Sequence, residues 1–163
     1  RNPPRHRRAV FIAERFADLI DLLKAKLDVQ VVVTRGPGDG TIIEKISRLA
    51  VGNAVYLKVM PLRQLAAVLS SVGVYVANDS GPMHIAAALG TKTIGIFGPG
   101  EENIWFPYCP PYYEASAGHL ALRKDVPCHP CHLDFCDREG EAYMECMKLL
   151  SVNEVFEEIR KRI

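Results

Sequence analysis

The chain has 163 residues, of which 48% are hydrophobic and 24% charged, and its formal net charge is +1 at pH 7. These values are typical of one globular domain with a substantial apolar core, and the charge excludes broad, nonspecific affinity for nucleic acid or membranes. No apolar run approaches the ~20 residues that a membrane-spanning helix needs. Because the chain opens on Arg-Asn-Pro-Pro, without an initiator Met, we expect it to be a piece of a longer protein.

Helical and extended patterns alternate along the first two thirds of the chain. A one-sided apolar pattern predicts a helix over 12–27, and the β-branched run over 29–34 predicts a strand buried on both faces. The alternation continues with helices over 42–49, 61–69 and 83–89 and with strands over 54–57, 74–77 and 93–97. This order predicts an α/β fold, a parallel sheet with helices on both faces.

The last third is less regular. A short strand is expected at 119–122 and a helix near 139–149. Ser151 and Glu154 have the spacing of a capping box, which predicts a terminal helix to about residue 162.

Ligands of parallel α/β sheets bind beyond the carboxyl ends of the strands. The predicted strands place four loops at this edge of the sheet: 35–40, 58–61, 78–82 and 98–105. Their convergence predicts a binding site there.

The strongest candidate site is the turn between the strand at 74–77 and the helix that follows it. A helix start carries unpaired N–H groups and a partial positive charge, so it is a natural cradle for phosphate. Ser80 adds a hydroxyl, Gly81 permits close approach of a ligand, and His84 follows one turn later. The alternative interpretations are that the turn simply caps the helix and that His84 is a core residue with its hydrogen bonds satisfied.

Three further residues have both a structural and a functional interpretation. Asp39 is a turn residue or an acidic contact to a ribose diol. Met60 is a core residue or a contact to an adenine ring. Arg8 belongs to a basic segment at the start of the chain, which is a solvated tail or a phosphate-facing loop.

Five cysteines are present, and four of them form a cluster: Cys128, Cys131, Cys136 and Cys146. An odd count argues against a closed disulfide framework. The cluster is compatible with a metal site, to which His129 and His132 add candidate ligands, with unliganded or redox-labile thiols, and with disulfide pairing. None of these interpretations indicates catalysis.

Two segments resemble glycosyltransferase family 9, the ADP-heptose:lipopolysaccharide heptosyltransferases. The first runs from Asn78 to Gly90, the second from Thr93 to Pro99, and the later cysteine pattern is similar to the tail of many members. The resemblance implies that the chain, residues 1–163, is the Rossmann-like, nucleotide-sugar-binding C-terminal half of a GT-B enzyme. The N-terminal acceptor domain, with the catalytic base, would then be absent from this chain.

By the same resemblance, Ser80, Gly81, His84 and Arg8 would bind the donor diphosphate, with Arg7 as an alternative to Arg8. Asp79 would contact the heptose, and Met60 and Asp39 the nucleoside. The departure from the family pattern at Phe11 and Ile12 makes the basic contact the least secure of these assignments.

The resemblance implies transfer of heptose from ADP-heptose to the lipopolysaccharide inner core, with no cofactor or metal required. The full-length enzyme would be cytoplasmic, at the inner face of the bacterial inner membrane, and this fragment alone would be inactive. The alternatives are a relative that uses another nucleotide sugar and a non-catalytic nucleotide-binding module.

Overall fold

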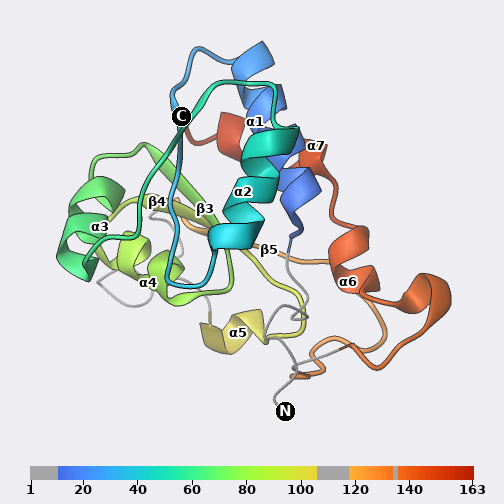
Figure 1. Ribbon diagram of the computed structural model, residues 1–163. Helices are drawn as coiled ribbons and strands as arrows, with labels where there is room; N and C mark the ends of the chain where they lie inside the picture. Colours follow the sequence, from blue (N-terminus) through green and yellow to red (C-terminus); the bar gives the residue numbers. More distant parts are fainter. Residues whose placement is uncertain (1–10, 106–117, 134–135) are drawn as a thin grey trace.

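The computed structural model describes residues 11–105, 118–133 and 136–163 (Figure 1). The chain follows the predicted alternation of helices and strands, with irregular segments near its end. The elements are α1 (Ala13–Lys26), β1 (Val31–Val33), α2 (Gly40–Leu49), β2 (Ala54–Tyr56), α3 (Leu62–Leu69), β3 (Val74–Asn78), α4 (Gly81–Ala88), β4 (Lys92–Ile96), α5 (Glu102–Trp105), β5 (Leu120–Leu122), the 3-10 helix η2 (Gly140–Ala142), α6 (Glu145–Lys148) and α7 (Val152–Arg160).

All strand pairs in the described part of the chain are parallel. β1 pairs with β2, while β3, β4 and β5 form a second sheet in which β4 is central. In this register Asn78 stands opposite Ile96, and Ile96 stands opposite Leu122. The carboxyl ends of β3, β4 and β5 therefore meet at one edge of the sheet.

Side chains on the three-stranded sheet alternate between two cores, as a strand period of two requires. Ile94 and Ile96 of β4 pack into the core cluster that contains residues of α1 and α7. Phe97, directly after β4, packs with Ala77 and Met83 on the opposite face, below α4. This sheet is thus covered by helices on both faces, which confirms the predicted fold class.

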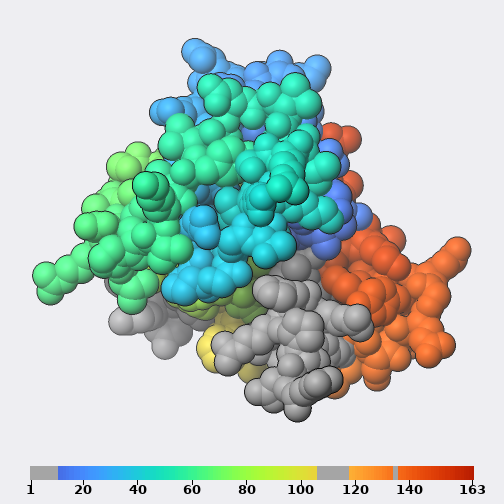
Figure 2. Space-filling model, in the orientation of Figure 1, coloured from blue at the N-terminus to red at the C-terminus, as the bar shows by residue number. Residues whose placement is uncertain are grey.

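In Figure 2, α2 lies near the centre of the visible face, with α3 on one side and the segment around α6 on the other. Within the described ranges, no helix is both long and apolar enough to cross a membrane.

Arg15 of α1 binds the carboxyl end of α6. The Arg15 guanidinium donates to the carbonyls of Met147 and Lys148, each at 2.6 Å, and to that of Leu150. A cation is favourable at these carbonyls because the carboxyl end of α6 presents unpaired acceptors.

The predicted capping box of α7 is present, with Ser151 and Glu154 bonded in both directions. Hydrogen bonds from Lys124 and from the Ser151 backbone lower the pKa of Glu154 to about 2. The carboxylate therefore stays charged at the helix start, where the dipole favours it.

Three predictions about local structure are wrong. The run over 29–34 yields a strand of three residues, Val31–Val33, and its side chains are half-buried because β1 pairs only with β2 among the described strands. The helix near 139–149 is broken into η2 and α6 by Met144, whose φ of 53° is left-handed. The loop 98–105 contains the short helix α5.

The fit of α4 over β4 generates a stability prediction. A Cβ at Gly95 would stand 2.4 Å from Sδ of Met83 and 2.8 Å from Cε2 of Phe97, both fully buried side chains. We expect Gly95→Ala to lower the free energy of unfolding by about 1–3 kcal/mol, the usual cost of overpacking. Urea denaturation followed by circular dichroism measures the change.

Gly73→Ala is the matched control, because a Cβ at Gly73 meets no atom within 4 Å. This variant should unfold at the wild-type urea concentration or slightly above it. Equal midpoints for Gly95→Ala and Gly73→Ala would show that the contact between Met83 and Gly95 is not tight.

His119, just before β5, generates a prediction about pH. It is 5% exposed, and neither ring nitrogen has a hydrogen-bond partner in the described part of the chain. Burial lowers the pKa of His119 below its ordinary value of 6.5, so the unfolded chain binds the proton more tightly than the folded protein. The free energy of unfolding should therefore fall as the pH drops below about 6.5, and His119→Leu should remove this part of the decline.

The urea midpoints of the wild type and of His119→Leu, measured between about pH 7.5 and 5.5, show how much of the decline in stability comes from His119. Glu154 does not confuse this comparison, since its contribution is present above 4.5 and is lost only at more acidic pH, as its pKa of about 2 is approached. A wild-type midpoint that changes no more than that of His119→Leu would contradict the prediction.

Candidate functional site

The turn after β3 stays bonded to the end of β4. The N–H of Asp79 donates to the Ile96 carbonyl at 3.0 Å, so the hydrogen-bond ladder continues one residue beyond the strand. Ser80 then takes an extended conformation, with φ −164° and ψ 160°, and α4 begins at Gly81. The sheet thus determines where the first turn of α4 stands.

This helix start is left open. The Ser80 side chain makes no capping hydrogen bond. Neither Ser80 nor Gly81 donates its N–H to a backbone carbonyl among the described residues. A Cβ at Gly81 would meet no atom within 4 Å. The hydroxyl and the amides are therefore accessible to a ligand, which is the arrangement that binds anions at helix termini.

The loop after β4 lies against the same turn. A Cβ at Gly100 would stand 2.8 Å from Oδ2 of Asp79, so the backbone of residue 100 packs directly beside this carboxylate. Two of the four predicted strand-end loops, 78–82 and 98–105, are thereby in contact. Asn78 adds a third segment, because its Oδ1 accepts the N–H of Phe11 at 2.8 Å.

His84 lies on α4 one turn after Ser80 and is half-buried. Its ring makes no hydrogen bond with any residue that the structure describes. The imidazole is therefore not the satisfied core histidine of the structural interpretation, and its donors and acceptors remain available.

The other predicted site residues are less closely connected to this turn. Oδ2 of Asp39 accepts the Gly36 N–H at 2.7 Å, so this exposed carboxylate holds its own loop, as the turn interpretation requires. Met60 packs, half-buried, against the cluster of Leu65, Leu69 and Ala86 between α3 and α4. Arg8 lies outside the described residues.

Arg35, which follows β1 and Thr34 in the loop 35–40, is not among the residues predicted from the sequence. Its Nε is buried and has no hydrogen-bond partner among the residues that the structure describes, and its Nη2 would stand 3.1 Å from a Cβ at Gly40. Thr34 connects this loop to β3, because its Oγ1 lies 3.3 Å from the hydroxyl of Tyr75. Burial raises the pKa of that hydroxyl. A cation directly after a predicted strand is the signal that would have identified Arg35.

A half-buried ionic cluster holds the loop after β4. Glu102 bonds Nε2 of His129 at 2.8 Å and Nε of Arg123 at 2.5 Å, and Nδ1 of His129 lies 3.0 Å from the Gly98 carbonyl. Burial raises the pKa of Glu102, but the hydrogen bonds to it and the adjacent charges outweigh that effect and lower the pKa overall.

His129 is therefore engaged on both ring nitrogens and is not free to act as a metal ligand. The N–H of His132 donates to the Pro99 carbonyl at 3.0 Å, and its ring lies beside Glu101. The residues between the cysteines thus dock the tail onto the loop after β4.

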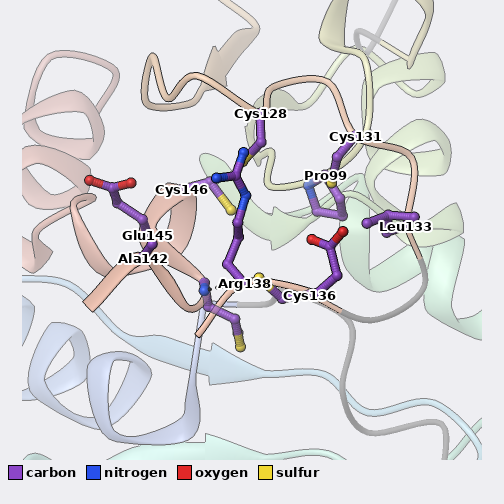
Figure 3. A pocket seen from close by; sticks show the side chains of 11 residues that line it. Pro99, Cys128, Cys131, Leu133, Cys136, Arg138, Ala142, Glu145 and Cys146 are labelled. Atoms are coloured by element: carbon purple, nitrogen blue, oxygen red, sulfur yellow. Dashed lines mark hydrogen bonds between the residues drawn. The ribbon is translucent and has the colours of Figure 1, made fainter. Parts of the chain in front are cut away.

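The four clustered cysteines, Cys128, Cys131, Cys136 and Cys146, line one cavity together with Pro99 and Arg138 (Figure 3). All four are free thiols and half-buried, so the structure contains no disulfide among them. Burial raises the pKa of the Cys146 thiol, and the other three cysteines raise it further. As arranged here, no group of three or more His, Cys, Asp or Glu side chains in the described ranges stands ready to hold a metal ion.

Comparison with curated proteins finds heptosyltransferases. The chain is 37% identical over 87 residues to lipooligosaccharide heptosyltransferase 2 of Campylobacter jejuni, covering 53% of this chain and 25% of that protein. It is 38% identical over 95 residues to lipopolysaccharide heptosyltransferase 1 of Pseudomonas aeruginosa, covering 57% of this chain and 25% of that protein. The chain thus spans about a quarter of the length of these relatives.

Solved structures share the fold. The family 9 glycosyltransferase of Veillonella parvula superimposes with a TM-score of 0.73 at 21% identity, covering 99% of this chain and 43% of that one. Escherichia coli heptosyltransferase WaaC with ADP superimposes with a TM-score of 0.66 at 22% identity, covering 94% of this chain and 40% of that one. These matches support the fold of one half of a GT-B glycosyltransferase.

The model of glycosyltransferase family 9 (heptosyltransferase) matches residues 8–131, which include the open start of α4, the loop after β4 and the first two clustered cysteines. The match covers most of the chain and agrees with the curated relatives, with the fold and with the motifs from Asn78 to Pro99. The chain belongs to glycosyltransferase family 9.

Proposed function

We propose that this chain is the donor-binding domain of a glycosyltransferase that moves heptose from ADP-heptose to the lipopolysaccharide inner core. The observation that carries the proposal is the open start of α4, where the Ser80 hydroxyl and two amides have no partner among the described residues. The heptosyltransferase relatives and the WaaC structure with ADP supply the chemical class of the ligand.

The diphosphate of the donor would bind at this helix start. Negative charge develops on the leaving ADP as the bond to the sugar breaks, and preorganised donors stabilise such charge most effectively. The amides of Ser80 and Gly81, the dipole of α4 and the imidazole of His84 would serve this purpose without a metal ion. Asp79, exposed and beside Gly100, would accept from hydroxyls of the heptose.

The remaining contacts are proposed for the nucleoside and for the phosphates. Met60 presents its exposed part next to the α3–α4 cluster, where it would lie by the adenine. Asp39 would contact the ribose while it holds its own turn. Arg8 would add a positive charge to the diphosphate site.

The acceptor would bind in an N-terminal domain. A carboxylate of that domain would deprotonate the acceptor hydroxyl as a general base, so this chain alone should bind the donor and transfer nothing. The full-length enzyme would work in the cytoplasm, at the inner face of the bacterial inner membrane, where it meets its lipid-linked acceptor.

Calorimetric titration of this chain with ADP tests the site. Asp79 is not in contact with ADP in this proposal, so the variants that matter are Ser80→Ala and His84→Ala. Each should raise the dissociation constant by roughly 10- to 100-fold, because each removes a hydrogen bond to a charged group, worth about 1.5–3 kcal/mol. The urea midpoints should stay at the wild-type value.

Ser71→Ala is the matched control for Ser80, because the Ser71 hydroxyl only bonds the Val68 carbonyl at the end of α3. This variant should bind ADP like the wild type. UDP and GDP should bind more weakly than ADP. Unchanged affinity in both site variants would reject the site, whereas tighter binding of UDP would retain the site and reject the ADP-sugar assignment.

A further inference from the structure

The four clustered cysteines converge on one small cavity, although they come from separate segments. Cys128 and Cys131 lie in the loop after β5, Cys136 precedes η2, and Cys146 is on α6. Figure 3 shows them on different sides of the cavity, around the side chain of Arg138. The fold, not the local sequence, brings the last two thiols to the first pair.

The size of the cavity restricts what it can hold. Its volume is about 20 Å³, just above the ~10–15 Å³ that a single water molecule needs. A nucleotide, a sugar or an iron–sulfur cluster does not fit such a space, whereas a single ion does.

Two polar groups lie beside the sulfurs. The N–H of Met144 donates to Sγ of Cys136 at 3.2 Å, which holds this sulfur at the wall of the cavity. The guanidinium of Arg138 lines the same cavity and would offset part of the charge of several thiolates. Thiolates are ligands that select zinc among the divalent ions of proteins.

The tail has little regular structure of its own. Between β5 and α6 the described residues form no strand and only the three-residue helix η2. Their polar connections to the rest of the fold include the ion pairs of Arg123 and Lys124, the His129 contacts to Gly98 and Glu102 and the His132 bond to Pro99. A cross-link between Cys128, Cys136 and Cys146 would fasten this irregular segment from within.

We propose that Cys128, Cys131, Cys136 and Cys146 bind a single zinc ion as a tetrahedral structural site. Each thiol gives its proton to solvent on binding, so four protons leave as the ion enters. Because no three of the described candidate ligands stand ready as arranged here, the sulfurs must turn inward about their side-chain torsions. Pro99 lines the cavity, so the ion would also brace the loop whose Gly100 lies beside Asp79.

The 163-residue chain, purified without chelator and under reducing conditions, should contain about one zinc per chain by mass spectrometry of the metal. After removal of zinc, Co²⁺ should produce the thiolate charge-transfer band and the intense visible bands of tetrahedral coordination. A chelator should lower the thermal midpoint of the zinc-containing protein.

The double variant Cys128→Ser/Cys131→Ser should lose both the zinc and the cobalt bands. Cys109→Ser is the control, because Cys109 stands apart from the cluster in the sequence. This variant should keep both the zinc and the cobalt bands. If the double variant does not fold, the wild-type protein is instead titrated with a chromogenic zinc chelator. The wild-type protein should then retain its zinc against micromolar chelator.

Three results would overturn the proposal. The first is wild-type protein that contains no zinc and gives no cobalt bands after reduction. The second is a disulfide among the four cysteines in the freshly isolated protein, detected by mass spectrometry after alkylation. The third is full retention of zinc in the folded double variant. Each readout is independent of ADP binding, so failure of the zinc site leaves the donor site untouched.

Discussion

The contact between Met83 and Gly95 determines where α4 stands on the sheet. Gly95 has no side chain, so the buried Met83 can lie against β4 at a distance that any Cβ would forbid. The Asp79 N–H bond to Ile96 holds the preceding turn to the same strand. Together these contacts place the start of α4 at the carboxyl edge of the sheet.

A second set of contacts connects the loop after β4 to the tail. Glu102 binds Arg123 and His129, and His129 in turn reaches the Gly98 carbonyl. This loop carries Gly100, which lies beside Asp79. The irregular tail therefore supports the loop beside the proposed donor site. The proposed role of the cysteine cluster is to stabilise this tail, which is a structural role and not a catalytic one.

The fold was predictable because apolar periodicity is a local property. The patterns over 12–27, 42–49 and 93–97 each record which side chains are buried, and burial is what selects the element. The errors fall where that signal is weak. Met144 breaks the expected helix through a left-handed backbone conformation that no apolar pattern encodes. The β-branched run over 29–34 gave no sign that β1 would remain half-buried.

The candidate site was only partly predictable. The motif from Asp79 to His84 is continuous in sequence, so its chemistry can be inferred without knowing what packs around it. Arg35 was missed because its importance lies in a buried Nε without a partner, which depends on the packing around it. His129 was interpreted as a candidate ligand because the sequence does not show that Glu102 already occupies its ring.

The sequence by itself determined the α/β class and the resemblance to family 9, and it was sufficient to predict a phosphate site at the turn after β3, because each rests on neighbouring residues. Only the tertiary structure decided that Gly100 lies against Asp79, that His129 holds the loop after β4 and that four cysteines share one cavity. These are contacts between segments distant in the chain, and their formation depends on how the helices and the tail pack on the sheet.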